Sequence, residues 1–194
     1  MLTQRNWETP PPDLGREVLE LENFPVYKQQ TDHTCGPCAA RMVLEYLGVE
    51  VEEKQLARRC LTHPWGTLHW TVLLGYNHYA RRAGYRVRMV EDHPHVFERV
   101  ILNLHRGLPT TFLYAVVDQF HPPVRVMHYG NLIGVDGPEA TVANANPFGV
   151  IEHMQLQEWW NRFSLLPEYM PEDQLFLIHL GPVKPRTVFL LQDR

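Results

Sequence analysis

Helical and strand patterns occupy different halves of this chain, and that segregation constrains its fold more than any other sequence feature. Apolar residues recur at the spacing of an amphipathic helix in the first half, over residues 36–47, 52–59, 68–83 and 95–106. Strand patterns dominate the second half, over 110–117, 124–135 and 141–146, after one early strand at 85–90. Helices first and an antiparallel sheet second predict an α+β fold.

The rest of the chain divides into three predicted segments. Residues 1–23 form a polar, Pro-rich N-terminal arm with a short helix over 14–21. Residues 24–164 form the main domain, which closes with a tryptophan-rich helix over 155–163. A C-terminal extension over 165–194 carries two further strands, at 175–180 and 187–191.

Composition excludes several classes of protein. The chain has 194 residues, 44% of them hydrophobic, which suffices to bury a core and excludes intrinsic disorder. A net charge of −4 without a basic stripe argues against a nucleic-acid partner. No apolar run is long enough for a membrane span, and the first residues lack the features of a signal peptide. Three cysteines imply no disulfide framework, so we expect a cytoplasmic protein.

Cys35 is the main candidate for chemistry, because it stands at the predicted start of the first helix. Unpaired N–H groups and the helix dipole favour an anion there, so the position predicts a lowered thiol pKa. A buried, inert cysteine is the alternative. The polar stretch over residues 29–34 argues against deep burial.

The segment Cys35-Gly36-Pro37-Cys38 also matches the thioredoxin redox motif. Thioredoxins place that motif directly after a buried strand, with a tryptophan before the first cysteine. Here a polar stretch precedes it and Thr34 holds the tryptophan position, so a thiol-disulfide oxidoreductase is the weaker interpretation.

The string from Gln29 to Gly48 resembles the double-glycine leader peptidases of bacterial bacteriocin exporters and their free-standing relatives, within the papain-like cysteine peptidase superfamily. Further matches follow in the family's order, at Gly66-Thr67, Gly107-Leu108-Pro109, His128-Tyr129, Asn146-Pro147-Phe148-Gly149 and Trp159-Trp160. The resemblance covers Phe24 to Ser164. It implies a papain-like fold, in which a helical lobe with the nucleophile packs on an antiparallel sheet, and a cysteine peptidase that needs no cofactor.

A thiol nucleophile needs a base, and His128 on a strand of the second half is the best placed of the eleven histidines. A third group must orient the imidazole. We expect Asn146 to do so, where the family more often has Asp, and Asn144 on the same strand face is the alternative. Gln29 and the Cys35 N–H would stabilise the oxyanion, with Gln30 as a substitute if the register differs by one.

Several alternatives stay open at this point. The predicted reaction is cleavage of a peptide or amide bond in a peptide or protein substrate, through a thioester and a Cys-His-Asn triad. The same residues would serve an acyltransferase, a transglutaminase or a deamidase. A binding module is less compatible with the presence of Cys35, His128 and Gln29 together. The histidines and cysteines form no complete zinc-ligand spacing, so no metal is predicted, and Cys38 and Cys60 are expected in the core.

Overall fold

The computed structural model describes residues 18–64, 66–118, 124–145, 150–164, 184 and 186–194. The first half contains β1 (Val18–Glu20), α1 (Cys35–Tyr46), α2 (Glu53–Arg59), α3 (His69–Ala80), a 3-10 turn η1 (Arg81–Ala83), β2 (Tyr85–Val90) and α4 (Val96–His105). The second half contains β3 (Thr110–Asp118), β4 (Val124–Asp136), β5 (Glu139–Asn144), β6 (Val150–Gln155), α5 (Leu156–Phe163) and β7 (Val188–Asp193).

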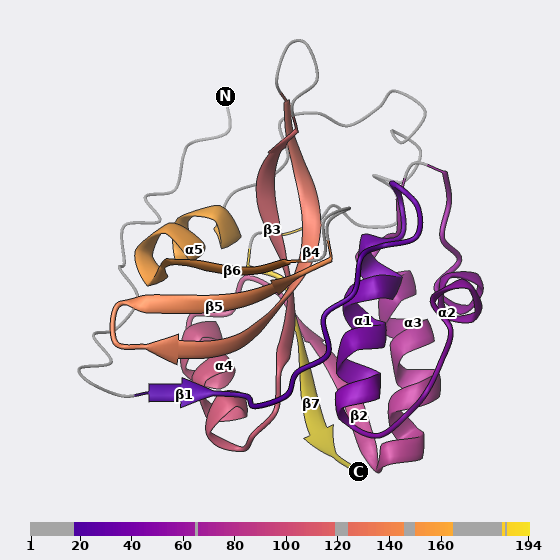
Figure 1. The fold of residues 1–194 in the computed structure, drawn as a ribbon, viewed down its shortest axis with the longest axis horizontal. Helices are drawn as coiled ribbons and strands as arrows, with labels where there is room; N and C mark the ends of the chain where they lie inside the picture. Colours follow the sequence, from indigo (N-terminus) through magenta and orange to yellow (C-terminus); the bar gives the residue numbers. More distant parts are fainter. Residues whose placement is uncertain (1–17, 65, 119–123, 146–149, 165–183, 185) are drawn as a thin grey trace.

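One antiparallel sheet organises these elements (Figure 1). Its strand order is β2-β7-β3-β4-β5-β6, and β1 pairs with the far end of β4. The strands β3, β4 and β5 follow each other along the chain and are neighbours in the sheet. The predicted α+β fold is thereby confirmed.

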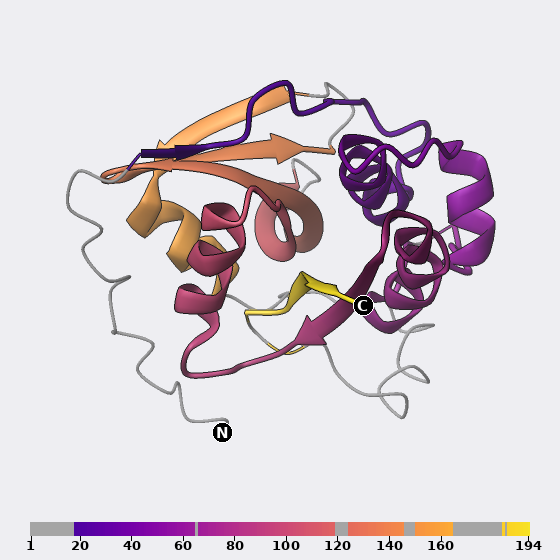
Figure 2. The ribbon, with the colours of Figure 1, turned by 90° about the horizontal axis from the view of Figure 1, so that it is seen from below.

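Helices cover both sides of this sheet. In Figure 1, α1, α2 and α3 lie together on one side, while α4 and α5 lie on the other. Figure 2 shows the sheet curving, with β5 and β6 along one side of α4 and α5, and β2 and β7 along the other. The helix α1 packs on α3 and β4, whereas α5 packs on β3, β5 and β6. Strand β4 is therefore the part of the sheet that α1 mainly contacts.

Close contact between α1 and β4 depends on small and polar residues. A Cβ atom on Gly36 would lie 2.8 Å from Val72 Cγ2 and 3.1 Å from the Tyr129 ring, so a glycine lets the helix start approach β4. One turn further, Asn131 Nδ2 on β4 donates to the carbonyl oxygen of Ala39 at 3.0 Å. These contacts fix the start of α1 against the middle of the sheet.

On the opposite side, α5 packs through aromatic rings. Trp159 is fully buried, stacks on Phe163 with ring centroids 5.0 Å apart, and meets the edge of Phe112 on β3 at 5.3 Å. Trp159 is therefore a residue of the hydrophobic core.

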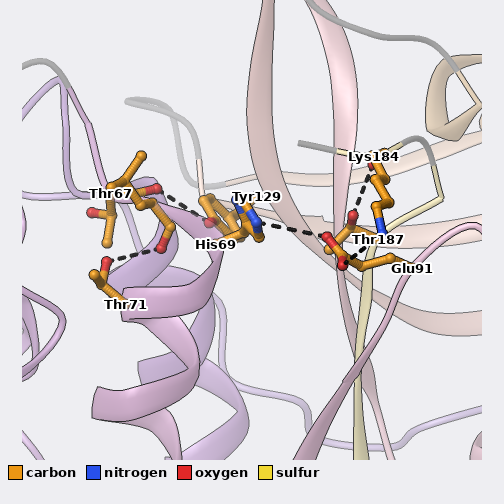
Figure 3. A network of polar contacts seen from close by, with 8 residues as sticks. Thr67, His69, Thr71, Glu91, Tyr129, Lys184 and Thr187 are labelled. Atoms are coloured by element: carbon orange, nitrogen blue, oxygen red, sulfur yellow. Dashed lines mark hydrogen bonds and ion pairs between the residues drawn. The ribbon is translucent and has the colours of Figure 1, made fainter. Parts of the chain in front are cut away.

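A polar network joins the start of α3 to the β2 and β7 segments (Figure 3). His69 Nε2 lies 3.6 Å from Glu91 Oε1, and Lys184 Nζ lies 3.8 Å from the other Glu91 oxygen. Tyr129 Oη donates to the Thr67 carbonyl at 3.2 Å. The loop before α3 is thus tied to β4 directly after His128.

Most predicted elements are present with ends shifted by a few residues, and β2 has the predicted bounds. The predicted helix over 14–21 is wrong at Val18–Glu20, which forms β1 instead, because Leu19 and its neighbours pair with β4. The strand β6 has no counterpart among the predictions. The predicted strand at 175–180 lies outside the described residues, whereas the one at 187–191 is confirmed as β7.

None of the helices in the described part of the chain has the length and apolar character needed to cross a membrane.

Candidate active site

Cys35 is the first residue of α1, and a compact turn positions it. Thr34 N and Thr34 Oγ1 both donate to the carbonyl oxygen of Thr31, at 3.3 and 3.0 Å. The next residue is free to begin the helix, and Thr34 O accepts from Cys38 N at 2.9 Å. The Cys35 side chain is half-buried, in contrast to the fully buried Cys38.

The pKa of the Cys35 thiol is raised, because burial disfavours the thiolate. The backbone N–H groups of Tyr129, Gly36 and Cys35 oppose this effect, and the charge of Glu53 adds to it. The predicted lowering of the thiol pKa is therefore wrong. Helix N–H groups act in the expected direction, but desolvation outweighs them. The Tyr129 N–H also shows that Cys35 lies beside the residue that follows His128.

His128 lies on β4 just beyond the end of the ladder with β5. Among the described residues, that ladder begins with Gly130 opposite Asn144. His128 Nε2 hydrogen-bonds to Asn144 Oδ1 at 2.7 Å. Burial lowers the pKa of His128 to about 4, while the bond to Asn144 raises it.

Asn144 is the last residue of β5 and only 3% exposed. Its amide nitrogen donates to Glu152 Oε1 at 2.6 Å, so the side chain spans from His128 on β4 to Glu152 on β6. Asn146, the expected orienting residue, lies outside the described residues. The structure thus brings the alternative, Asn144, to the imidazole.

Tyr114 closes the site from β3, where it stands directly opposite His128. The two rings meet edge to face with centroids 5.9 Å apart. Burial raises the pKa of Tyr114, and the charges of Glu152 and Cys35 raise it further. One phenol therefore lies near the thiol, the imidazole and the Glu152 carboxylate.

Gln29 and Gln30 precede the turn and differ in their contacts. Gln29 Nε2 donates to the Thr31 carbonyl at 2.8 Å, and its Oε1 is buried without a hydrogen-bond partner in the described structure. The side chain of Gln30 is exposed, and its backbone N–H donates to Glu53 Oε1 at 2.8 Å. Glu53 is fully buried at the start of α2, so a carboxylate supports the loop from behind.

The other cysteines belong to the core. Cys38 and Cys60 are fully buried and free, and burial raises the pKa of Cys60 to about 12. Cys38 Sγ lies 3.5 Å from the carbonyl oxygen of Tyr27. Within the described ranges, no three His, Cys, Asp or Glu side chains are grouped to hold a metal ion.

Sequence reasoning identified neither Glu152 nor Glu53 as a site residue. Glu152 stands on a strand that local patterns did not predict. Glu53 opens a predicted helix, where an acidic residue is ordinary. A fully buried acid is not, but its burial is visible only in the structure.

Comparison with known proteins places this site in context. A model of the Peptidase C39-like family matches residues 21–165 of the chain. No curated protein sequence matches it.

Several solved structures share the fold. The chain resembles the peptidase domain of Streptococcus ComA, a bifunctional ABC transporter of a quorum-sensing pathway, at 13% identity and a TM-score of 0.59, over 88% of this chain and 99% of that one. A protein from Bacillus anthracis described as a C39-like peptidase is 14% identical to this chain, with a TM-score of 0.61. The match covers 92% of this chain and 98% of that one. The double-glycine motif protease of an AMS/PCAT transporter, solved with a leader peptide, is 15% identical to this chain, with a TM-score of 0.52. The match covers 92% of this chain and 100% of that one. The resemblance inferred from the sequence motifs is thus confirmed.

Proposed function

Because the chain belongs to the Peptidase C39-like family, we propose that it is a cysteine peptidase with Cys35 as nucleophile and His128 as base. The observation that carries this proposal is the hydrogen bond between His128 Nε2 and Asn144 Oδ1, at the point of β4 that Cys35 contacts. It leaves Nδ1 of the imidazole to receive the thiol proton.

The resting pair is a neutral thiol and a neutral imidazole. Burial raises the pKa of Cys35 and lowers that of His128, so both charged forms are disfavoured in the absence of substrate. Proton transfer from Sγ to Nδ1 then accompanies attack on the substrate carbonyl. This resembles a serine-type general-base step more than a preformed ion pair.

In each half of the proposed reaction, His128 first accepts a proton and then donates it. Attack by Sγ forms a tetrahedral oxyanion, which collapses to a thioester as the imidazolium gives its proton to the departing amine. The neutral imidazole then takes a proton from water, and the hydroxide attacks the thioester carbon. The carboxyl product leaves, and the imidazolium returns its proton to Cys35.

The oxyanion is assigned to two donors at the helix start. They are the Cys35 backbone N–H and the second N–H of the Gln29 side chain, whose first N–H holds Thr31 O. The bond to Thr31 orients the amide nitrogen, and the buried Glu53 holds the neighbouring backbone in place.

We assign orientation of the imidazole to Asn144. Its amide oxygen is already at 2.7 Å from the ring, and its burial keeps water from competing for that bond. Asn146 stays a prediction from sequence alone.

A peptide is the proposed substrate. The fold is shared with a protease solved in complex with a leader peptide, and that protease is named for a double-glycine motif. We therefore choose peptides containing Gly-Gly as the first assay substrates.

Labelling with an electrophilic peptide tests the proposal. A Gly-Gly peptide chloromethyl ketone is expected to alkylate Cys35, which mass spectrometry of the digested protein would identify. Cys35→Ala should abolish both labelling and cleavage, whereas Cys38→Ala, matched in chemistry, should retain both. Label on another residue, or cleavage by the Cys35→Ala variant, would refute the assignment.

The products separate hydrolysis from acyl transfer. Cleavage in the presence of an added amine yields a free carboxyl group if water is the acceptor and an amide if the amine is. A thiol-disulfide exchange activity that requires both Cys35 and Cys38 would instead support the redox interpretation.

A further inference from the structure

We propose that Glu152 is a positioning residue, which acts through Asn144 to fix the protonation pattern of the His128 ring. The inference deepens the proposed peptidase function and rests on it. Three side chains from three adjacent strands carry it: His128 on β4, Asn144 on β5 and Glu152 on β6.

The first step is the orientation of the Asn144 amide. A side-chain amide has a donor end and an acceptor end, and either could face a neighbour. Here the donor end, Nδ2, lies 2.6 Å from Glu152 Oε1. A carboxylate has no proton to donate, so the reversed amide would set two acceptor oxygens against each other. Glu152 thus selects the orientation in which Oδ1 faces the imidazole.

The second step is the tautomer of His128. Oδ1 of Asn144 can only accept, so the ring nitrogen at 2.7 Å, Nε2, must carry the hydrogen. Nδ1 then keeps its lone pair, which the general-base role requires. With the amide reversed, Nδ2 would donate to Nε2 and the hydrogen would move to Nδ1. In that tautomer Nδ1 carries a hydrogen and cannot accept the thiol proton.

The burial pattern of β6 marks Glu152 as unusual. Val150 and Ile151 are exposed, Ile151 by 47%, while Glu152 is partly buried and turns toward Asn144. An apolar side chain facing water beside an acid facing inward reverses the usual preference. Inward-facing charges can also protect an edge strand from pairing with other chains. That role needs a charge on β6, but it does not require a hydrogen bond to Asn144.

The carboxylate lies beside an apolar strand partner and a buried phenol. Val142 is the cross-strand partner of Glu152, and Tyr114 lies close enough for the charge of Glu152 to raise its pKa. A water molecule cannot replace the bond to Asn144 readily, since Asn144 is nearly inaccessible. Glu152 therefore holds the donor end of the amide in place.

A charge-exchange cycle tests this arrangement. Asn144→Asp alone sets two carboxylates in contact and is expected to lower kcat by about a hundredfold. Glu152→Gln alone removes the carboxylate that favours one orientation of the amide and should lower kcat by about tenfold with little change in KM. In the double variant N144D/E152Q, the amide introduced on β6 can donate to the carboxylate introduced on β5, which accepts from Nε2 of His128. We expect kcat within about tenfold of the native value.

An NMR measurement of the His128 tautomer and a control variant complete the test of the role of Glu152. Nitrogen-15 NMR of the histidine rings should show the hydrogen of His128 on Nε2 in the native protein and in the double variant, and a mixture of tautomers in E152Q. This readout needs no substrate. Glu139→Gln, an exposed glutamate on the neighbouring strand β5, is the matched control and should change neither measurement.

The outcomes separate the two proposals. If E152Q leaves kcat and the tautomer unchanged, or if the double variant is no better than N144D, the role of Glu152 is refuted while Cys35-dependent cleavage still stands. If cleavage survives Cys35→Ala, the peptidase proposal itself fails, and the NMR result alone then decides whether Glu152 fixes the ring.

Discussion

At the scale of single residues, desolvation governs the charge state of Cys35, the proposed nucleophile. Because burial raises the pKa of Cys35, its thiolate forms only at alkaline pH. We predict that the rate of alkylation by iodoacetamide rises with pH without a plateau between pH 5 and 8 (roughly the range in which an ion-paired thiolate would already react). Cys35→Ala supplies the background from Cys38 and Cys60. A plateau that His128→Ala removes would contradict this and indicate a preformed ion pair.

The charge of Glu53 also raises the pKa of the Cys35 thiol. It raises the pKa of both Cys35 and Cys38 from behind the Gln29–Gln30 loop. Glu53→Gln keeps an acceptor for the Gln30 N–H and removes the charge, so the alkylation profile of Cys35 should shift toward lower pH. Glu52→Gln, at the exposed neighbouring position, should leave the profile in place. An unchanged profile in Glu53→Gln would mean that the buried acid is not charged in the folded protein.

A pair of substitutions tests which residue is the third member of the proposed triad. Asn144→Ala should lower kcat about a hundredfold, since the imidazole loses its orienting bond, while Asn146→Ala should stay close to native. Steady-state cleavage of a Gly-Gly peptide measures both. The reverse result would restore Asn146 to the role that the end-of-strand motif predicted.

At the scale of elements, the packing of α1 on the sheet should be sensitive to one methyl group. Gly36→Ala would place a Cβ atom 2.8 Å from Val72 Cγ2 and 3.1 Å from the ring of Tyr129. We expect a loss of about 1–3 kcal/mol in the free energy of unfolding, from overpacking. Urea denaturation measures it, and Val72→Ala in the same background should recover part of the loss. Equal stability of Gly36→Ala and the native protein would show that α1 can move away without cost.

The sequence predicts elements whose apolar residues follow a clear helix or strand period. It does not predict strands that form mainly because a neighbouring strand offers backbone partners. The strand β2 was found with its bounds because Tyr85, Val87 and Met89 alternate with arginines. The strand β6 was not predicted because its apolar residues do not alternate: Val150 and Ile151 are adjacent, and two polar residues separate them from Met154. A helix period fits residues 14–21, but Val18–Glu20 forms β1 because the edge of β4 offers backbone partners.

The residues of the candidate site also divide into those that local sequence patterns predict and those that depend on neighbouring elements. Cys35 and His128 are predicted from residue type and element, because a thiol at a helix start and a histidine on a strand suit acyl chemistry. The choice between Asn144 and Asn146 depends on where β5 ends relative to β4, which spacing alone does not fix. Glu152 could not be chosen at all, since its strand was unknown.

For the whole molecule, buried histidines should set the acid limit of stability. Burial lowers the pKa of His128 to about 4 and also lowers that of His69, so in both cases the unfolded chain binds protons more readily. Stability that is present above about pH 6.5 is therefore lost as the pH falls toward 4. For His128 this is at most about 3 kcal/mol, less where water reaches the half-buried ring.

Urea denaturation at pH 7, 5.5 and 4.5 would measure this loss (pH values chosen to span roughly the shifted range). His128→Gln should flatten the dependence on pH, and the exposed His95 offers a matched control in His95→Gln. A native slope in His128→Gln would mean that the titration of His128 is the same in the folded and unfolded chain.

The position of β7 has a consequence for synthesis. Its residues follow all other described elements along the chain, yet it lies between β2 and β3 in the sheet. While β7 is still untranslated, β2 with the helices α1 to α3 and the β3–β6 strands each present an open edge where it will insert. Until β7 pairs with both parts, the sheet has a gap between β2 and β3, and the two parts are joined through the packing of α1 on β4. A nascent chain of this kind completes its sheet only after translation has passed Asp193, and chaperones that shield strand edges would act in that interval.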